Sequence, residues 1–265
     1  MEQALFVSKI DSLKYFDDTD EFSRLYFGME FCERLIPDVD DLKKVISFVN
    51  EKKIEFTLVT PYVTEDGLER VERLLKTLVV LKPDSEVVFN DWGVFQLLSD
   101  NYAGLVPVLG RLLNKMKRGP RLMNVLDKIP EESVTYYRSP SITIPAIREF
   151  LLKEGICRVE FDNLFQGVDL ERCGDEIKKT LYLPFAFITT TRLCLSALCD
   201  RPDKARDVGI SPCSHECQRY TFYLKNPIMT TGLIRKGNTI FFCNEEIPDN
   251  LRMFDRVVIE PEIPI

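Results

Sequence analysis

Half of the cysteines in this chain lie in one short segment. The sequence has 8 cysteines, and those within residues 194–217 are Cys194, Cys199, Cys213 and Cys217. Paired ligands of structural zinc sites commonly have about two to four residues between them. Four residues lie between Cys194 and Cys199, and three lie between Cys213 and Cys217. Thiolates bind soft metals, and zinc and iron–sulfur centres usually take four ligands. The spacing therefore predicts a metal centre but does not distinguish zinc from an iron–sulfur cluster.

The other residues capable of chemistry give weaker signals. His215 is the only histidine, and we expect an exposed loop residue rather than a ligand or acid–base group, which also argues against a Ser-His-Asp hydrolase. Trp92 is expected to pack at the rim of the fold, with substrate stacking as the alternative. Three further thiols are expected to pack in the core, as free cysteines commonly do: Cys157, Cys173 and Cys243.

Composition narrows the class of protein. The chain has 265 residues, 45% of them hydrophobic and 29% charged, which is typical of a globular protein with one large α/β domain or two small ones. The net charge of -7 argues against broad binding to nucleic acid. Neither a signal peptide nor an apolar run of membrane-spanning length is expected. We therefore expect a cytoplasmic protein with no membrane span, whose clustered thiols stay reduced and bind metal.

A basic segment interrupts this acidic background. Between residues 111 and 121 the sequence carries five cationic side chains: Arg111, Lys115, Lys117, Arg118 and Arg121. Such a run is typical of a solvated loop, and the alternative is a site for an anion or a phosphate.

Strand and helix signals alternate along the chain. The expected strands are residues 25–32, 54–60, 85–93, 105–110, 135–138, 157–163, 181–188 and 255–260, and the expected helices are residues 39–50, 65–81, 94–100 and 144–154. This alternation predicts parallel strands with crossover helices, and eight strands favour a TIM-like (β/α)8 barrel that need not be regular. No Gly-x-Gly-x-x-Gly turn follows the first strand, which disfavours a dinucleotide-binding sheet.

The alternation of strand and helix signals stops after the seventh expected strand. Residues 190–249 hold the cysteine segment and a hairpin-like pair of strands, residues 220–224 and 239–243. No stretch has the composition of a linker, so we expect one domain, residues 1–265, with a cysteine-rich insertion at 190–249.

Polar and cysteine side chains recur where the expected strands end. They are Cys32, Thr60, Asn90, Asp91, Arg111, Glu160, Asp162, Asn163, Thr189, Cys194 and Glu260. The C-terminal ends of barrel strands form one face, where active sites lie. The acidic and amide side chains among them are suited to acid–base work or to capping helices, and the sequence does not separate these roles.

Three stretches resemble the collagenase-like peptidase family U32. They are Leu-Tyr-Phe-Gly-Met-Glu-Phe-Cys at 25–32, Asn-Asp-Trp-Gly-Val at 90–94, and the set Leu-Pro-Phe-Ala at 183–186, Arg-Leu-Cys at 192–194, Asp-Arg-Pro-Asp at 200–203 and Cys-Ser-His-Glu-Cys at 213–217. The pattern is most similar to the branch of accessory proteins of oxygen-independent ubiquinone biosynthesis.

The resemblance implies a barrel that carries a 4Fe–4S cluster. Cys194, Cys213 and Cys217 match three ligands of that branch, and Cys32 matches its fourth. Cys199 departs from the pattern but is close in sequence, so either Cys32 or Cys199 completes the set. Cys32 is favoured, because a thiol at a strand end would tie the cysteine segment to the barrel mouth.

The same resemblance implies a function and partners. It implies an oxygen-independent hydroxylation or a related modification, a hetero-partner of the same family, and a small-molecule or quinone-like substrate. The alternatives are a peptidase, as the family name records, and a non-catalytic scaffold with a structural zinc.

Overall fold

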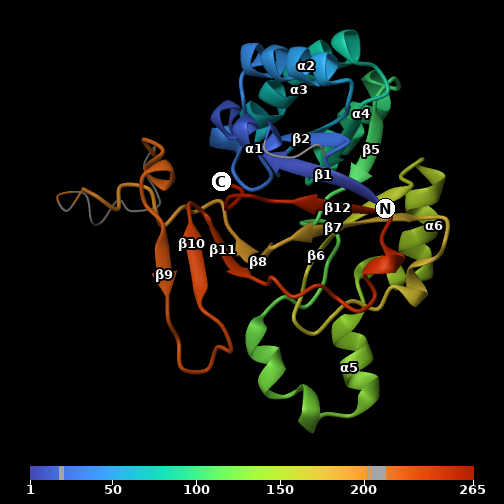
Figure 1. Ribbon diagram of the computed structural model, residues 1–265, viewed down its shortest axis with the longest axis vertical. Coiled ribbons are helices and arrows are strands. Elements are labelled where there is room, and N and C mark those ends of the chain that lie inside the picture. Colours follow the sequence, from blue (N-terminus) through green and yellow to red (C-terminus); the bar gives the residue numbers. More distant parts are fainter. Residues whose placement is uncertain (18–20, 202, 204–212) are drawn as a thin grey trace.

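Eight parallel strands close into a barrel, as predicted (Figure 1). The computed structural model describes residues 1–17, 21–201, 203 and 213–265, so residues 202 and 204–212 of the expected insertion lie outside the described part. The order around the barrel is β1-β12-β7-β6-β5-β4-β3-β2. The strands are β1 (Glu2–Val7), β2 (Arg24–Gly28), β3 (Glu55–Val59), β4 (Glu86–Phe89), β5 (Val106–Leu109), β6 (Arg158–Asp162), β7 (Lys178–Leu183) and β12 (Arg256–Ile259).

Helices follow most of these strands. The α-helices are α1 (Lys14–Asp17), α2 (Val39–Lys52), α3 (Glu65–Leu81), α4 (Trp92–Asn101), α5 (Glu131–Arg138) and α6 (Pro145–Lys153). Short 3-10 helices are η1 (Ile10–Leu13), η2 (Glu33–Leu35), η3 (Pro120–Asn124), η4 (Leu126–Lys128), η5 (Ser141–Thr143), η6 (Glu171–Cys173), η8 (Glu216–Gln218) and η9 (Leu251–Met253). Among the residues that the structure describes, no helix has both the length and the apolar character of a membrane span.

The long helices form where the sequence supplies caps and an apolar face. The side chains of Asp38, Thr64 and Asp91 accept hydrogen bonds from the first-turn amides of α2, α3 and α4. In α2 the buried residues recur at helical spacing: Leu42, Val45, Ile46 and Val49. They pack against the outside of the barrel within the largest hydrophobic cluster of the molecule.

The expected strand at residues 135–138 is wrong, the expected strand at 181–188 is divided into two strands on either side of Pro184, and two strands, β1 and Leu233–Lys236, were not predicted. Residues 135–138 belong to helix α5, which begins directly after Pro130 and has Glu131 and Glu132 in its first turn. These are helix-start signals that outweigh the β-forming Thr135 and its tyrosine neighbours. Strand β1 was not predicted, and it closes the barrel by pairing with both β12 and β2.

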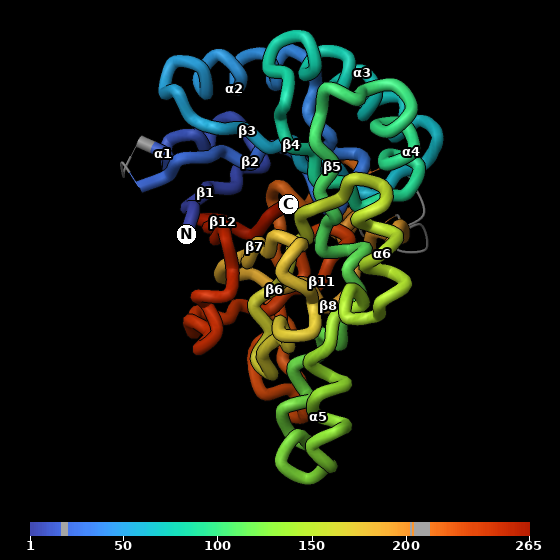
Figure 2. Tube along the Cα trace, turned by 90° about the vertical axis from the view of Figure 1, so that its right-hand side faces the viewer, coloured from blue at the N-terminus to red at the C-terminus, as the bar shows by residue number. Residues whose placement is uncertain are grey.

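A second, antiparallel sheet extends from the barrel mouth. It contains β8 (Phe185–Thr190), β9 (Phe222–Leu224), β10 (Leu233–Lys236) and β11 (Thr239–Cys243) in the order β8-β11-β10-β9. Figure 1 shows these strands beside the barrel, and Figure 2 shows the segment around α5 projecting from the opposite end to α2 and α3. The expected pair at 220–224 and 239–243 is separated by β10, because the turn at Gly237 folds β10 directly onto β11.

Apolar side chains join this sheet to the barrel mouth. They form a buried cluster of Phe31, Leu112, Phe187, Cys217, Phe241 and Ile265. The rings of Phe31 and Phe241 meet edge to face, with their centroids 5.1 Å apart. Because Phe31 precedes Cys32 and Cys217 is itself a member, this packing holds two of the predicted ligands near each other.

Candidate functional site

Four of the predicted ligands line one small cavity at the barrel mouth. Cys32, Cys194, Cys213 and Cys217 all contribute to a cavity of about 170 Å³. Cys32 follows strand β2, Cys194 follows β8, and the other two precede β9, with Cys217 inside η8. Three separate parts of the chain therefore supply thiols to the same cavity.

Backbone geometry at Gly28 directs Cys32 toward this cavity. Gly28 ends β2 with a φ of 137°, a conformation that L-residues rarely adopt. A Cβ at this position would also collide with the carbonyl oxygen of Val59 on the neighbouring strand. Only glycine fits, and the turn that it permits carries the chain from the barrel wall to Cys32.

Asn238 connects the segments that carry the cysteines. Its side-chain amide donates to the carbonyl oxygens of Phe31 at 2.6 Å and of Thr191 at 2.9 Å, and to the hydroxyl of Tyr62 at 3.0 Å. Phe31 and Thr191 lie close in sequence to Cys32 and Cys194, respectively. The amide therefore fixes the barrel side of the cavity relative to the cysteine segment before any metal binds.

Of the four cysteines, Cys217 is buried and the other three are half-buried. Burial raises the pKa of Cys32 to about 11, although a backbone hydrogen bond from Arg34 opposes the rise. Burial also raises the pKa of Cys194 against hydrogen bonds from the backbone amides of Ser196 and Ala197. Buried thiols stay neutral unless a cation favours the thiolate. Metal binding at this cavity must therefore displace protons.

Arg34 and His215 also contribute to the cavity wall. The Arg34 side chain hydrogen-bonds the thiol of Cys213, and His215 lines the cavity as an exposed residue with a left-handed backbone. Within the described residues, no group of three or more His, Cys, Asp or Glu side chains has the geometry of a single metal-ion site.

The other cysteines occupy different surroundings. Cys199 is half-buried beside Asp200 and does not contribute to the wall of the four-cysteine cavity. Cys173 is buried, as expected of a packing thiol, whereas Cys157 is exposed directly before β6 and Cys243 is half-buried at the end of β11. The expectation of core packing is therefore wrong for Cys157.

A buried ion-pair cluster lies under the same mouth. Arg111 is fully buried, and its guanidinium contacts Glu30 at 2.6 Å, Glu260 at 2.7 Å and Asp162 at 3.2 Å. The guanidinium also lies 3.8 Å from the ring centre of Tyr182. Glu30 was not among the predicted candidates, although an acidic residue between apolar neighbours directly after a strand is the signal that would have revealed it.

Arg118 extends the cluster into the basic segment. It pairs with Asp162 at 2.9 Å and donates to the backbone carbonyls of Arg111 and Asn114. Two of the five cations between residues 111 and 121 are therefore buried structural groups, contrary to a fully solvated loop. The remaining three, Lys115, Lys117 and Arg121, are exposed.

Two carboxyl groups inside the barrel lack a full set of partners. Among the described residues, Glu160 Oε2 and Glu260 Oε2 are buried without a hydrogen bond. Burial raises the pKa of Glu160 to about 7 and that of Glu260 to about 8. Protonation of Glu260 near neutral pH would leave Arg111 and Arg118 balanced by Glu30 and Asp162, so the cluster would carry no net charge.

Replacing Glu160 by Gln is expected to flatten the pH dependence of stability. The folded state binds a proton at Glu160 up to about pH 7, whereas an unfolded Glu loses it near its usual value of 4.5. The free energy of unfolding should therefore fall as the pH rises through this window, by about 3 kcal/mol from this group. Urea denaturation from about pH 5 to pH 8 measures the slope.

The control for this substitution is the exposed Glu69→Gln. It removes a carboxylate without changing the barrel interior, so its slope should match that of the wild type. Equal slopes for Glu160→Gln and the wild type would contradict the assignment of a buried, proton-binding carboxyl.

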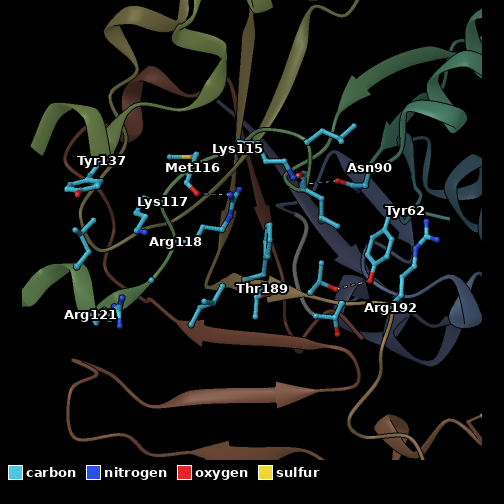
Figure 3. A pocket seen from close by; sticks show the side chains of 18 of the residues that line it. Tyr62, Asn90, Lys115, Met116, Lys117, Arg118, Arg121, Tyr137, Thr189 and Arg192 are labelled. Carbon is cyan, nitrogen blue, oxygen red and sulfur yellow. Dashed lines mark hydrogen bonds between the residues drawn. The ribbon is translucent and has the colours of Figure 1, made fainter. Parts of the chain in front are cut away.

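A much larger cavity opens beside the four cysteines. It has a volume of about 1280 Å³ and lies between the strand ends of the barrel, the basic segment and strand β8. Figure 3 shows Lys117, Arg121 and Tyr137 on one side and Tyr62 and Arg192 on the opposite side. Tyr62 and Arg192 also line the four-cysteine cavity, so they form a wall common to both.

Several predicted strand-end residues lie in or beside this larger cavity. Asn90, Asp91 and Thr189 line it, and Trp92 lines it while packing on Phe89 and Phe150. Asp91 caps α4 and also accepts a hydrogen bond from the amide of Val63. The main role of its carboxylate is therefore structural, as a helix cap. Asn163 instead donates to the carbonyls of Asn244 and Glu246 and has a structural role.

Comparisons with known proteins give little beyond the architecture itself. No family model matches the chain, and no curated protein matches it. Among solved structures, 4 chains match, and one of these is the structure of the U32 peptidase Mk0906. That match covers 100% of this chain and 94% of the other chain, at 11% identity and a TM-score of 0.49. Neither family nor activity follows from a likeness at this level.

Proposed function

We propose that this chain is an iron–sulfur protein in which Cys32, Cys194, Cys213 and Cys217 hold a 4Fe–4S cluster at the mouth of the barrel. The observation that carries the proposal is the single cavity lined by these four thiols, which come from three separate parts of the chain. Soft thiolate ligands and a count of four suit such a cluster.

The size of the cavity favours a cluster over a single zinc ion. In a tetrahedral zinc site with Zn–S bonds of about 2.3 Å, the sulfurs lie roughly 3.8 Å apart and enclose only the ion. The cavity of about 170 Å³, which the four thiols line together with other side chains such as Leu35 and Ile265, has room for several atoms. A structural zinc remains the second candidate, because the same ligands bind it.

The chain's own groups are placed to support the bound centre. A cluster held by four thiolates supplies one-electron transfer rather than an open coordination site. The amides of Ser196 and Ala197 donate to Cys194, and Arg34 donates to Cys213. Hydrogen bonds and positive charge near ligand sulfurs stabilise the thiolate form and tune the centre. The common wall of Tyr62 and Arg192 separates the thiols from the larger cavity, where a substrate would bind.

We further propose that the reaction is an oxygen-independent hydroxylation or a related modification. This step rests on the resemblance of the cysteine and strand-end motifs to the quinone-pathway branch of the U32 peptidases. By the same argument, the chain would work in the cytoplasm with a hetero-partner of its family on a small-molecule or quinone-like substrate. Peptide hydrolysis is the less favoured activity, because it requires an activated nucleophile or a metal-bound water.

Anaerobic purification is expected to yield a brown protein. Its visible absorption should be that of an iron–sulfur centre, with about four iron and four sulfide ions per chain and little zinc. The test is an absorption spectrum combined with iron, sulfide and zinc analysis of one sample. Colourless protein loaded with zinc would overturn the iron–sulfur assignment in favour of the scaffold with a structural zinc.

A further inference from the structure

We propose that the large cavity binds an organic anion with an apolar body, whose acidic group contacts Lys117 and Arg121. This inference rests on the proposed function, because it names the class of substrate that would bind at the same barrel mouth. The binding itself does not require the metal centre, since Lys117 and Arg121 do not line the four-cysteine cavity.

The cavity wall carries an excess of positive charge. Its cationic residues are Lys115, Lys117, Arg118, Arg121 and Arg192. Among the residues that the structure describes, Asp91 is the only acidic one in the wall, and its carboxylate already accepts hydrogen bonds from the amides of Gly93 and Val63. A concave surface of one charge sign concentrates ligands of the opposite sign.

Not all of these cations are available to a ligand. Arg118 is committed to Asp162, Lys115 donates to the carbonyl of Leu112 at 2.7 Å, and Arg192 donates to that of Val63 at 2.9 Å. Within the described part of the chain, Lys117 and Arg121 form no ion pair, and both are exposed. These two lie on the same side of the cavity (Figure 3), so both are placed to attract an acidic group that binds there.

The rest of the wall suits an apolar body rather than a bare inorganic ion. Trp92, Leu112, Met116, Phe187 and Ile188 all line the cavity. Trp92 is 47% exposed despite its ring contacts, so much of its surface is open to a ligand. A volume of about 1280 Å³ also exceeds what a phosphate or sulfate ion fills. An anion with an attached aromatic or aliphatic body matches both the charge and the apolar walls.

Such a ligand would reach toward the thiols. Its far end would meet Tyr62 and Arg192, which face the acidic group's site across the cavity (Figure 3). The Tyr62 hydroxyl is held by Asn238 and lies 3.3 Å from the hydroxyl of Thr190. One layer of side chains therefore separates the ligand's far end from the four-cysteine cavity.

A matched pair of dyes tests the proposal. The anionic probe is 8-anilinonaphthalene-1-sulfonate, and the neutral probe, N-phenyl-1-naphthylamine, has the same rings without the sulfonate. We expect one sulfonate probe per chain, bound at least about tenfold more tightly than the neutral probe. Trp92 is the only tryptophan and lines this cavity, so quenching of its fluorescence reports a probe bound near it.

Substitutions then separate charge from apolar contact. The double variant Lys117→Gln with Arg121→Gln should weaken the sulfonate probe about tenfold or more and leave the neutral probe within about twofold. Lys128→Gln is the control, because Lys128 is exposed in the neighbouring η4 and does not line the cavity. It should leave both probes unchanged.

Several results would overturn the proposal. They are equal affinity of the sulfonate probe for the wild type and the double variant, an equal weakening of both probes, or no quenching of Trp92. The dye titrations are repeated on Cys194→Ser, which lacks a predicted ligand. Retained dye binding in Cys194→Ser would show that the anion site does not depend on the metal centre. Charge-dependent dye binding in an anaerobically purified wild-type protein without iron would sink the iron–sulfur proposal alone, whereas an iron-loaded wild-type protein with no charge-dependent binding would sink only this one.

Discussion

Replacing Arg111 by Met is expected to lower the free energy of unfolding by at least about 3–5 kcal/mol, or to prevent folding at neutral pH. Arg111 is fully buried and contacts Glu30, Asp162 and Glu260. Its removal leaves three carboxyl groups together without their main counter-charge. Those groups must then take up protons or stay charged in a medium that solvates them poorly, and both outcomes cost free energy.

Arg121→Met is the matched control for this prediction. It makes the same substitution in the same basic segment, but Arg121 is exposed and lies in the wall of the large cavity. Its effect on stability should stay within about 0.5 kcal/mol. Urea denaturation of both variants, followed by circular dichroism, provides the comparison. Arg111→Met with wild-type stability would show that the buried cluster does not hold the barrel mouth together.

Replacing Cys32 by Ser is expected to lower the iron content per chain about tenfold or more. A serine hydroxyl is a poor ligand for a soft metal, so the variant has only three good ligands for a centre that needs four. Cys199→Ser is the comparison, because Cys199 lies closer in sequence to the other ligands but outside the four-cysteine cavity. We expect Cys199→Ser to retain the iron and the visible absorption of the wild type.

The two variants decide the fourth ligand when they are purified side by side without oxygen. Iron and sulfide analysis per folded chain is the measurement, with circular dichroism to confirm that both variants fold. Loss of iron in Cys199→Ser and retention in Cys32→Ser would reverse our assignment. Retention in both would show that neither thiol is required.

The barrel was predictable because its strand and helix signals alternate along most of the chain. Two of the errors, residues 135–138 and β1, have local causes. A short segment such as Thr-Tyr-Tyr has strand propensity, but Pro130 and the acidic first turn of α5 set the helix. Strand β1 precedes the first recognisable strand–helix unit, so periodicity did not identify it, and only closure of the sheet by β12 shows that it is required.

The cysteine site was predictable in part. Spacing predicted a metal centre among Cys194, Cys199, Cys213 and Cys217, but spacing alone says nothing of Cys32, which lies far upstream. The strand-end pattern placed Cys32 on the barrel face, but only the resemblance to a family made it a candidate ligand. Its place beside the other three follows from the turn at Gly28 and the packing of Phe31. Contacts between distant segments are set by tertiary packing, which local patterns do not record.

The basic segment shows the same limit. The sequence predicts either a solvated loop or an anion site for all five cations, whereas in the structure the five side chains have different surroundings. Arg111 and Arg118 are buried against carboxylates, and Lys117 and Arg121 face a cavity. The partners of Arg111 come from three different strand ends, so sequence proximity gave no sign of the division.

The central claim is that four thiols of this chain hold one 4Fe–4S cluster. Native mass spectrometry of the anaerobically purified protein tests it most directly, because it counts the bound atoms. We predict a mass about 350 Da above that of the metal-free chain, as four iron and four sulfide ions require. An excess of about 60 Da, which corresponds to one zinc ion, or no excess at all would contradict the claim.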